Sequence, residues 1–473
     1  MTGESKLPDN DDIQDLLKAF ERLCAGRGNG FLSEDSFERI IDHFDDINSL
    51  SKAMEAAEMG ILQYPYSCTL LVKKADLLIA NRQYKRALVV LDKAEILDRN
   101  DIDIYVLRTD AYLALDMQDK AVALLEDAIS QFDGDERIDL LFELADVYDD
   151  YEAFEKIFDC LKLILDYDPN NEEALYKICF WTDFTGRSEE SIRLHLKIIE
   201  DFPYNDLAWF NLAAAYQGLR LFEKSIDAYQ YAIAINEKFD FAYRNMADAM
   251  MRLHRYKEAI ESLERVIELA RPEDLIYQAI GFCYEKIKNY AQARFYYRKA
   301  SHLNPDDAKI YLKVAGTYIK ESKHAQAIKY LDTALRIKRL DPEFNLTMGE
   351  CLVKVGKLRE AVHYFMAAVQ ARPKNIKSWE ALIAALFISG QFKEAQKQVE
   401  MARVKTGNKP MFDYYDSAIL LSIGKIKPGL DLLESSIEAQ PRLLKKFLKL
   451  YPSSVKFPQV VELILKYKRK KRI

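Results

Sequence analysis

The chain has 473 residues, of which 49% are hydrophobic and 30% charged, and its formal net charge is −7 at pH 7. This composition excludes a disordered or fibrous chain. No apolar run approaches the ~18 residues of a membrane-spanning helix, which excludes a transmembrane segment. The six cysteines are scattered without a CxxC pair, so we expect buried, reduced thiols in the cytoplasm and neither a disulfide framework nor a metal site.

Residues 1–33 are expected to form a flexible N-terminal segment with one short capping helix. The opening MTGESKLPDNDD is polar and acidic and lacks the apolar core of a secretory signal. Residues 11–24 have the spacing of an amphipathic helix, with Asp11 or Asp12 as its cap. The glycine-rich stretch 25–30 lacks the strand and the Gly-Lys-Ser/Thr of a phosphate-binding loop. Ser33 or Ser36 can then cap the next helix.

Residues 34–442 repeat with a period of 34, and residues 274–307 show the unit best. Apolar and small residues form two helical stripes: Tyr277, Ile280, Gly281 and Tyr284, then Tyr290, Ala293, Tyr297 and Ala300. Pro305 ends the unit because proline cannot supply the amide of a continuing helix. One such helix pair cannot bury its apolar face alone and needs copies as neighbours.

Two positions of the unit establish the period, counting Asp274 as position 1. Position 32 is occupied by Pro169, Pro203, Pro305, Pro373 and Pro441, and position 20 is Ala, Ser or Gly in eleven of twelve units. Pro65 and Pro169 are three periods plus two residues apart. We therefore place a two-residue insertion near residues 133–136 and expect a loop to absorb it.

The pattern resembles the tetratricopeptide repeat (TPR), which has an aromatic residue at position 4, Leu-Gly/Ala at 7 and 8, Tyr at 11, Ala at 20, an aromatic residue or Leu at 24, Ala at 27 and Pro at 32. One unit reproduces most of this pattern with Trp209, Leu212, Ala213, Tyr216, Tyr229 and Ala232. The resemblance implies an all-α fold, a right-handed TPR-type α-solenoid of antiparallel helix pairs that forms a superhelix. About twelve units would cover residues 34–442.

One unit departs most from the pattern, with Cys179, Thr182, Ser191 and His195 at positions 8, 11, 20 and 24. His195 lies on the apolar stripe of its second helix, so we expect a buried, hydrogen-bonded histidine and no catalytic role. The chain has no HExxH, GxSxG or P-loop motif and no Cys/His cluster. We therefore predict no enzyme activity, cofactor or metal.

Residues 443–473 are expected to be capping helices with a basic tail. Leu443–Tyr451 and Pro458–Tyr467 have helical patterns, separated by a break at Pro452. Lysines on these helices can supply the water-facing surface that a terminal repeat needs. The chain then ends with the basic residues Lys468, Arg469, Lys470, Lys471 and Arg472.

In TPR proteins, positions 2, 5, 9 and 12 of the first helix line a concave groove in which peptides or helices bind. Carried over by the resemblance, these positions give the candidate partner-binding residues Asp42, Asp45, Asp76, Asp110, Phe142, Asp146, Asp149, Tyr176, Phe180, Phe210, Phe241, Arg244 and Phe282. The predicted groove is acidic in its N-terminal half and aromatic in the middle. Residues 1–150 carry 33 acidic and 16 basic side chains, a net charge of −17, whereas the remaining residues carry +10.

We interpret the chain as an interaction scaffold for a basic partner segment with apolar anchors. The carboxylate clamp of other TPR proteins is matched only in part by Asn211, Asn245 and Arg244, and the surrounding acidity argues against its acidic ligand. An alternative is that the basic tail binds nucleic acid or an anionic membrane surface. The tail also fits a charged helix end favoured by the helix dipole. A third hypothesis is a head-to-tail homo-oligomer of acidic and basic halves.

Overall fold

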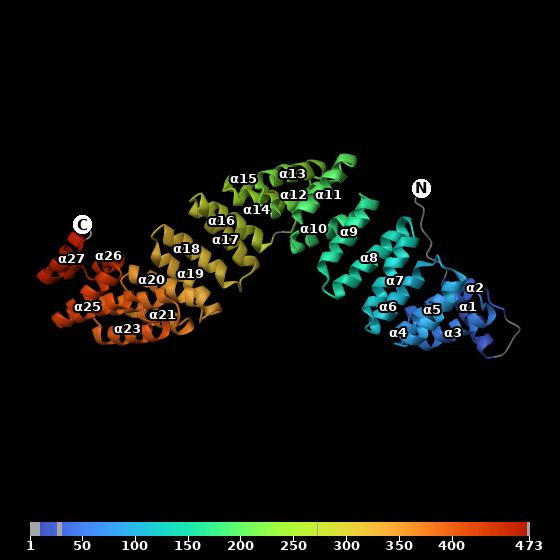
Figure 1. Ribbon diagram of the computed structural model, residues 1–473, viewed down its shortest axis with the longest axis horizontal. Helices are drawn as coiled ribbons and strands as arrows, with labels where there is room; N and C mark the ends of the chain where they lie inside the picture. The colour runs from blue at the N-terminus through green and yellow to red at the C-terminus, as the bar shows by residue number, and fades with distance from the viewer. Residues whose placement is uncertain (1–9, 26–30, 272, 471–473) are drawn as a thin grey trace. The chain divides into compact units, whose positions relative to one another are not determined.

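The repeated apolar stripes fold into antiparallel helix pairs (Figure 1). The computed structural model describes residues 10–25, 31–271 and 273–470, and within these ranges it contains helices and turns but no strand. Contacts between Cα atoms divide the chain into two units, residues 1–237 and 238–473. Each unit has its own stack of helix pairs.

The first unit begins with α1 (Asn10–Cys24), and Asp11 and Asp12 lie inside this helix. The first helices of its pairs are α2 (Glu34–Asp46), α4 (Cys68–Ala80), α6 (Ile102–Ala114), α8 (Gly134–Asp150), α10 (Glu172–Thr185) and α12 (Asp206–Gly218). The second helices are α3 (Leu50–Gln63), α5 (Tyr84–Leu97), α7 (Gln118–Gln131), α9 (Phe154–Tyr167), α11 (Ser188–Asp201) and α13 (Phe222–Ile235). Ser33 caps α2, since its Oγ accepts a hydrogen bond from the Ser36 amide at 3.3 Å.

The second unit repeats the arrangement. Its first helices are α14 (Asp240–Arg252), α16 (Asp274–Lys286), α18 (Ala308–Lys320), α20 (Pro342–Lys354), α22 (Ile376–Ile388) and α24 (Pro410–Ser422). Its second helices are α15 (Tyr256–Leu269), α17 (Tyr290–Leu303), α19 (His324–Ile337), α21 (Leu358–Ala371), α23 (Phe392–Thr406) and α25 (Ile426–Ala439). The unit ends with two 3₁₀ turns, η1 (Pro441–Leu443) and η2 (Pro452–Lys456), and the helices α26 (Leu444–Leu450) and α27 (Pro458–Lys470).

The backbone repeats with the same period as the sequence. The turn inside each pair passes through one residue with positive φ at position 15: Asn48, Arg82, Asp116, Glu152, Gly186, Arg220, His254, Lys288, Ser322, Gly356, Gly390 and Gly424. A left-handed residue commonly ends a helix because it lets the last carbonyl groups find hydrogen-bond partners. Every pair therefore turns at the same place.

Small residues let the two helices of a pair approach closely. In the pair α16 and α17, a Cβ added to Gly281 would lie 2.6 Å from Cε1 of Tyr297, which is buried. Ala293 and Ala300 are also fully buried on α17. The predicted alternation of large tyrosines and small residues is confirmed in this pair.

The two-residue insertion lies in a helix, so the prediction that a loop absorbs it was wrong. α8 has 17 residues where a typical first helix has 13, and only Phe132 and Asp133 separate it from α7. No proline stands at this boundary, and Asp135 and Glu136 favour a helix start because they lie at the positive end of the helix dipole. The added residues therefore lengthen the first turn of α8.

His195 is packed in the core of the first unit, as predicted. Its side chain is completely buried, and Nδ1 lies 2.7 Å from the Ser191 carbonyl oxygen. Burial lowers the pKa of His195 to about 4. The imidazole is therefore neutral at pH 7 and acts as a packed core residue.

Candidate partner-binding surface

The first helices of neighbouring pairs lie close together in three parts of the array. α2, α4, α6 and α8 contact one another in sequence in the first unit, as do α20, α22 and α24 in the second, and α10 contacts α12 more than it contacts its own pair partner α11. The corresponding second helices are in less contact. This arrangement is expected where first helices form the inner layer of a curved stack. We call the surface made by positions 2, 5, 9 and 12 of the first helices the groove face.

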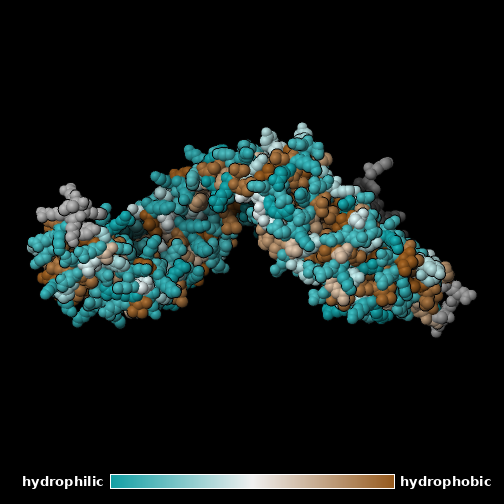
Figure 2. Space-filling view, viewed as in Figure 1, coloured by the Kyte–Doolittle hydropathy of each residue, from teal (hydrophilic) through white to brown (hydrophobic). Residues whose placement is uncertain are grey.

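The predicted aspartates of the groove face are exposed. Asp42, Asp45, Asp76, Asp110, Asp146 and Asp149 all have exposed side chains. Together with Glu143, which sequence reasoning missed at position 6, we call them the acidic stripe. Hydrophobic residues interrupt an otherwise mostly hydrophilic surface in both units (Figure 2).

Carboxylates of the acidic stripe influence one another from helix to helix. Partial burial raises the pKa of Asp76, Asp110 and Glu143. A neighbouring carboxylate on the preceding first helix adds to the rise in each case: Asp45 for Asp76, Asp76 for Asp110, and Asp110 for Glu143. Like charges that face one another favour protonation or a cation between them. Carboxylates of the stripe therefore repel one another from α2 to α8.

Lys73 pairs with Asp42 of the acidic stripe. Lys177, which pairs with Glu173 of α10 at 2.8 Å, opposes the rise in the pKa of Asp146. Among the described side chains, Asp76, Asp110 and Glu143 form no ion pair. The described residues of the chain hold no group of three His, Cys, Asp or Glu side chains that could bind a metal ion.

An aromatic patch lies on α10, next along the array from α8. Tyr176, Phe180 and Phe184 follow one another at intervals of four residues, and their side chains are 71%, 61% and 56% exposed. They share one face of the helix because four residues are about one turn. Of these three, Phe184 was missed at position 13, although the spacing of four was visible in the sequence.

Two further aromatic rings support the aromatic patch from beneath. Trp181 lies with its ring 5.0 Å from that of Phe180, and Phe154 of α9 stacks on Trp181 at 5.5 Å. Phe154 also contacts Phe184 edge to face at 4.9 Å. Such contacts fix the orientation of the Phe180 and Phe184 rings.

The other predicted aromatic and basic residues are less exposed than the side chains of the aromatic patch, or are paired. Phe142 is half-buried beneath the Lys177 ammonium group, 4.9 Å from its ring. Phe210 is half-buried, with its ring 5.6 Å from that of Tyr229. In the second unit, Arg244 pairs with Glu273 at 3.4 Å, whereas Phe241 and Phe282 are 51% and 39% exposed.

The partial match to a carboxylate clamp fails on Asn211. Its side chain is buried, and Nδ2 donates a hydrogen bond to the Leu175 carbonyl oxygen at 2.7 Å. The amide ties α12 to α10 and does not face a ligand. A clamp that uses this asparagine is therefore excluded.

At the end of the second unit the groove face is covered by the chain itself. The predicted helices after residue 442 are confirmed as α26 and α27. The lysines of α26 are exposed, as expected, and one of them, Lys446, also pairs with Glu380 of α22 at 3.1 Å. Tyr451 lies 5.4 Å from the ring of Phe387, also on α22. Sequence reasoning missed this contact.

The basic tail begins within α27. Lys468, Arg469 and Lys470 belong to the last turn of α27, and Lys471 and Arg472 lie outside the described residues. Within the described ranges, no helix combines the length and apolar character needed to cross a bilayer.

Two family models match the chain. The tetratricopeptide repeat protein 21 C-terminal ARM domain matches residues 210–355, and the tetratricopeptide repeat matches residues 342–375. Among curated proteins, none matches the chain. The matches agree with the helix pairs and their 34-residue period. Residues 210–375 therefore consist of tetratricopeptide repeats.

Solved structures with this architecture are similar to parts of the chain. YrrB, described as a TPR protein with an unusual peptide-binding site, is 16% identical with a TM-score of 0.35 and covers 40% of this chain and 96% of its own. The Cut9–Hcn1 hetero-tetramer of the APC/C matches at 14% identity and a TM-score of 0.33, covering 86% and 95%. The C-terminal part of a TPR protein from Cytophaga hutchinsonii matches at 14% identity and a TM-score of 0.44, and the match covers 54% of this chain and 98% of its own. Such scores say nothing of what this chain binds.

Proposed function

We propose that the chain is a protein-interaction scaffold whose groove face in the first unit holds a basic partner segment with apolar anchors. The observation that carries this proposal is the aromatic patch beside the acidic stripe. Three exposed aromatic rings on α10 follow a band of carboxylates, several of which have no ion pair among the described side chains. A TPR fold suits such a role because its repeats build an extended binding surface.

The aromatic patch would supply most of the affinity. Large aromatic side chains that become buried at the centre of an interface commonly contribute about 2 kcal/mol or more each. Tyr176 and Phe180 have most of their surface available for burial. Neighbouring rings already hold Phe180 in place, so little conformational entropy would be lost when a partner binds.

The acidic stripe would supply orientation and speed of association. Aligned carboxylates attract a basic segment from a distance and reject an acidic one. Partial burial and, after it, repulsion by a neighbouring carboxylate raise the pKa of Asp76, Asp110 and Glu143. A cationic partner would relieve this repulsion, so the bound state favours Lys and Arg side chains over the stripe.

The test is affinity capture from native cell extract with the full chain as bait. Changing Tyr176 and Phe180 to Ala should lower recovery of specific partners by about tenfold or more, since two central anchors are removed. The matched control is Tyr204→Ala, because Tyr204 is 85% exposed at the turn before α12 and off the groove face. Equal recovery with both variants, at unchanged helical content, would remove this site.

A further inference from the structure

α26 shows what kind of segment the groove face accepts. In α24 the residues at positions 2 and 5, Met411 and Tyr414, are buried, whereas position 2 is exposed in most other first helices. Phe447 of α26 is buried there, 6.1 Å from the Tyr414 ring. Beside it, Lys446 pairs with Glu380 at position 5 of α22. A short amphipathic helix thus places an aromatic side chain on the groove face and a lysine on a carboxylate.

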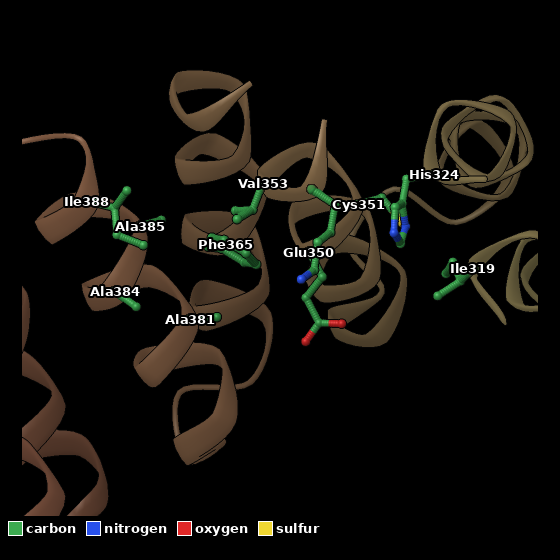
Figure 3. A pocket seen from close by; sticks show the side chains of 11 residues that line it. Ile319, His324, Glu350, Cys351, Val353, Phe365, Ala381, Ala384, Ala385 and Ile388 are labelled. Atoms are coloured by element: carbon green, nitrogen blue, oxygen red, sulfur yellow. The ribbon is translucent and has the colours of Figure 1, made fainter. Parts of the chain in front are cut away.

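A cavity of about 350 Å³ opens on the same groove face, one helix earlier, between α20 and α22. Figure 3 shows Ala384, Ala385 and Ile388 of α22 across from Val353 and Glu350 of α20. The cavity is lined by position 9 of both helices, which is the small Ala384 in α22 and Glu350 in α20. Its volume lies within the range of about 300–1,000 Å³ that is usual for ligand sites.

The cavity lining is apolar apart from a few ionisable side chains. Glu350 has no ion pair within the described part of the chain. Partial burial raises the pKa of Glu350, which the charge of Lys377 opposes. Lys354 also lines the cavity, but it forms no ion pair with Glu350. In the same wall, the buried Nδ1 of His324 has no hydrogen-bond partner.

We propose that this cavity binds a basic amphipathic helix of a partner protein, with an apolar side chain among Ala384, Ala385 and Val353 and a cation on Glu350. The proposal deepens the proposed use of the groove face but concerns a different unit. Continuity with the seat of α26 and the charge of Glu350 support this assignment. The adjoining part of the surface already holds a helix of this kind through Glu380, and Glu350 offers the next carboxylate without a partner.

The probe is a fluorescein-labelled, amidated peptide with the sequence of residues 441–451, PRLLKKFLKLY. Its binding to the full chain is measured by fluorescence anisotropy. Glu350→Gln removes the charge that would hold the lysine, and Ala384→Leu fills the cavity. Each should raise Kd by about tenfold, because a charge-assisted contact or a packed anchor is lost. Circular dichroism checks that both variants fold.

The control is Glu360→Gln, which removes an exposed carboxylate that pairs with Lys357 on α21 at 2.9 Å, and it should leave Kd unchanged. Absence of saturable binding, or wild-type Kd in both cavity variants, would overturn the proposal. Loss of binding only in Glu380→Gln would mean that the peptide displaces α26 from α22 and does not bind in the cavity. That result would also overturn the proposal.

Phe180→Ala separates this proposal from the proposed function. It should leave peptide binding unchanged, because Phe180 lies in the first unit. If Phe180→Ala alone abolished binding, the aromatic patch would be the site of the peptide and the cavity would not.

Discussion

His195 links the stability of one repeat to pH. Its pKa is about 4 in the folded chain against an ordinary value of 6.5. Between these values the unfolded chain binds the proton and the folded chain does not, so folding becomes less favourable as the pH falls from 6.5 towards 4. The loss can reach about 3 kcal/mol. Carboxylates with raised pKa values act in the opposite direction, since the folded chain protonates them more readily.

We predict that His195→Leu reduces the fall in urea midpoint between pH 7 and pH 5, measured by circular dichroism. The variant cannot take up the proton that favours unfolding. The absolute midpoint can change because the side chain differs in shape, so the pH dependence is the quantity to compare. The control is His302→Leu, because His302 is exposed at the end of α17. An identical pH dependence in His195→Leu and wild type would contradict the account.

At the scale of the helix pair, two glycines offer a matched comparison. Gly281 in α16 faces the Tyr297 ring, whereas a Cβ on Gly316 in α18 would meet no atom within 4 Å. Gly281→Ala should lower the free energy of unfolding by about 1–3 kcal/mol because Tyr297 must move. Gly316→Ala should raise it by up to about 1 kcal/mol because alanine favours helix.

The measurement is the urea midpoint of each glycine variant. Both substitutions add one methyl group to the interior of a first helix in the second unit, so opposite signs isolate packing from helix propensity. Equal effects would mean that the close approach of α16 and α17 does not depend on Gly281.

The helix pairs could be predicted because close packing requires small residues at fixed positions. Position 20 shows this requirement from Ala53 to Gly429, and the backbone turns with the same period. The insertion near α8 was placed correctly along the chain but assigned to a loop. A loop and a lengthened helix have the same residue count, and only local capping and charge separate them.

The groove face could be predicted only in part. Positions 2 and 9 of the first helices are mostly exposed, since they lie between the stripes that pack the core. The burial of Asn211 and the covering of Glu380 by Lys446 depend on contacts 36 and 66 residues apart. The repeat period alone does not predict such contacts. The cavity beside Glu350 likewise depends on which neighbours fill the space around Ala384.

At the scale of the whole chain, charge is distributed unevenly along the sequence. Residues 1–150 carry a net charge of −17 and the rest +10. The acidic stripe concentrates part of this negative charge on one face of the first unit. Long-range attraction of a basic partner should therefore weaken as salt is added, because the Debye length falls from about 10 Å at 0.1 M to about 3 Å at 1 M.

Site-specific photo-crosslinking tests the central claim most directly. A benzoylphenylalanine at Phe180, on the groove face, is compared with one at Leu163, which is 52% exposed on the second helix α9. In native extract we predict adducts from Phe180 that map to basic segments of partner proteins, and few or none from Leu163. Adducts of equal yield at both positions, or adducts from Leu163 alone, would contradict the account.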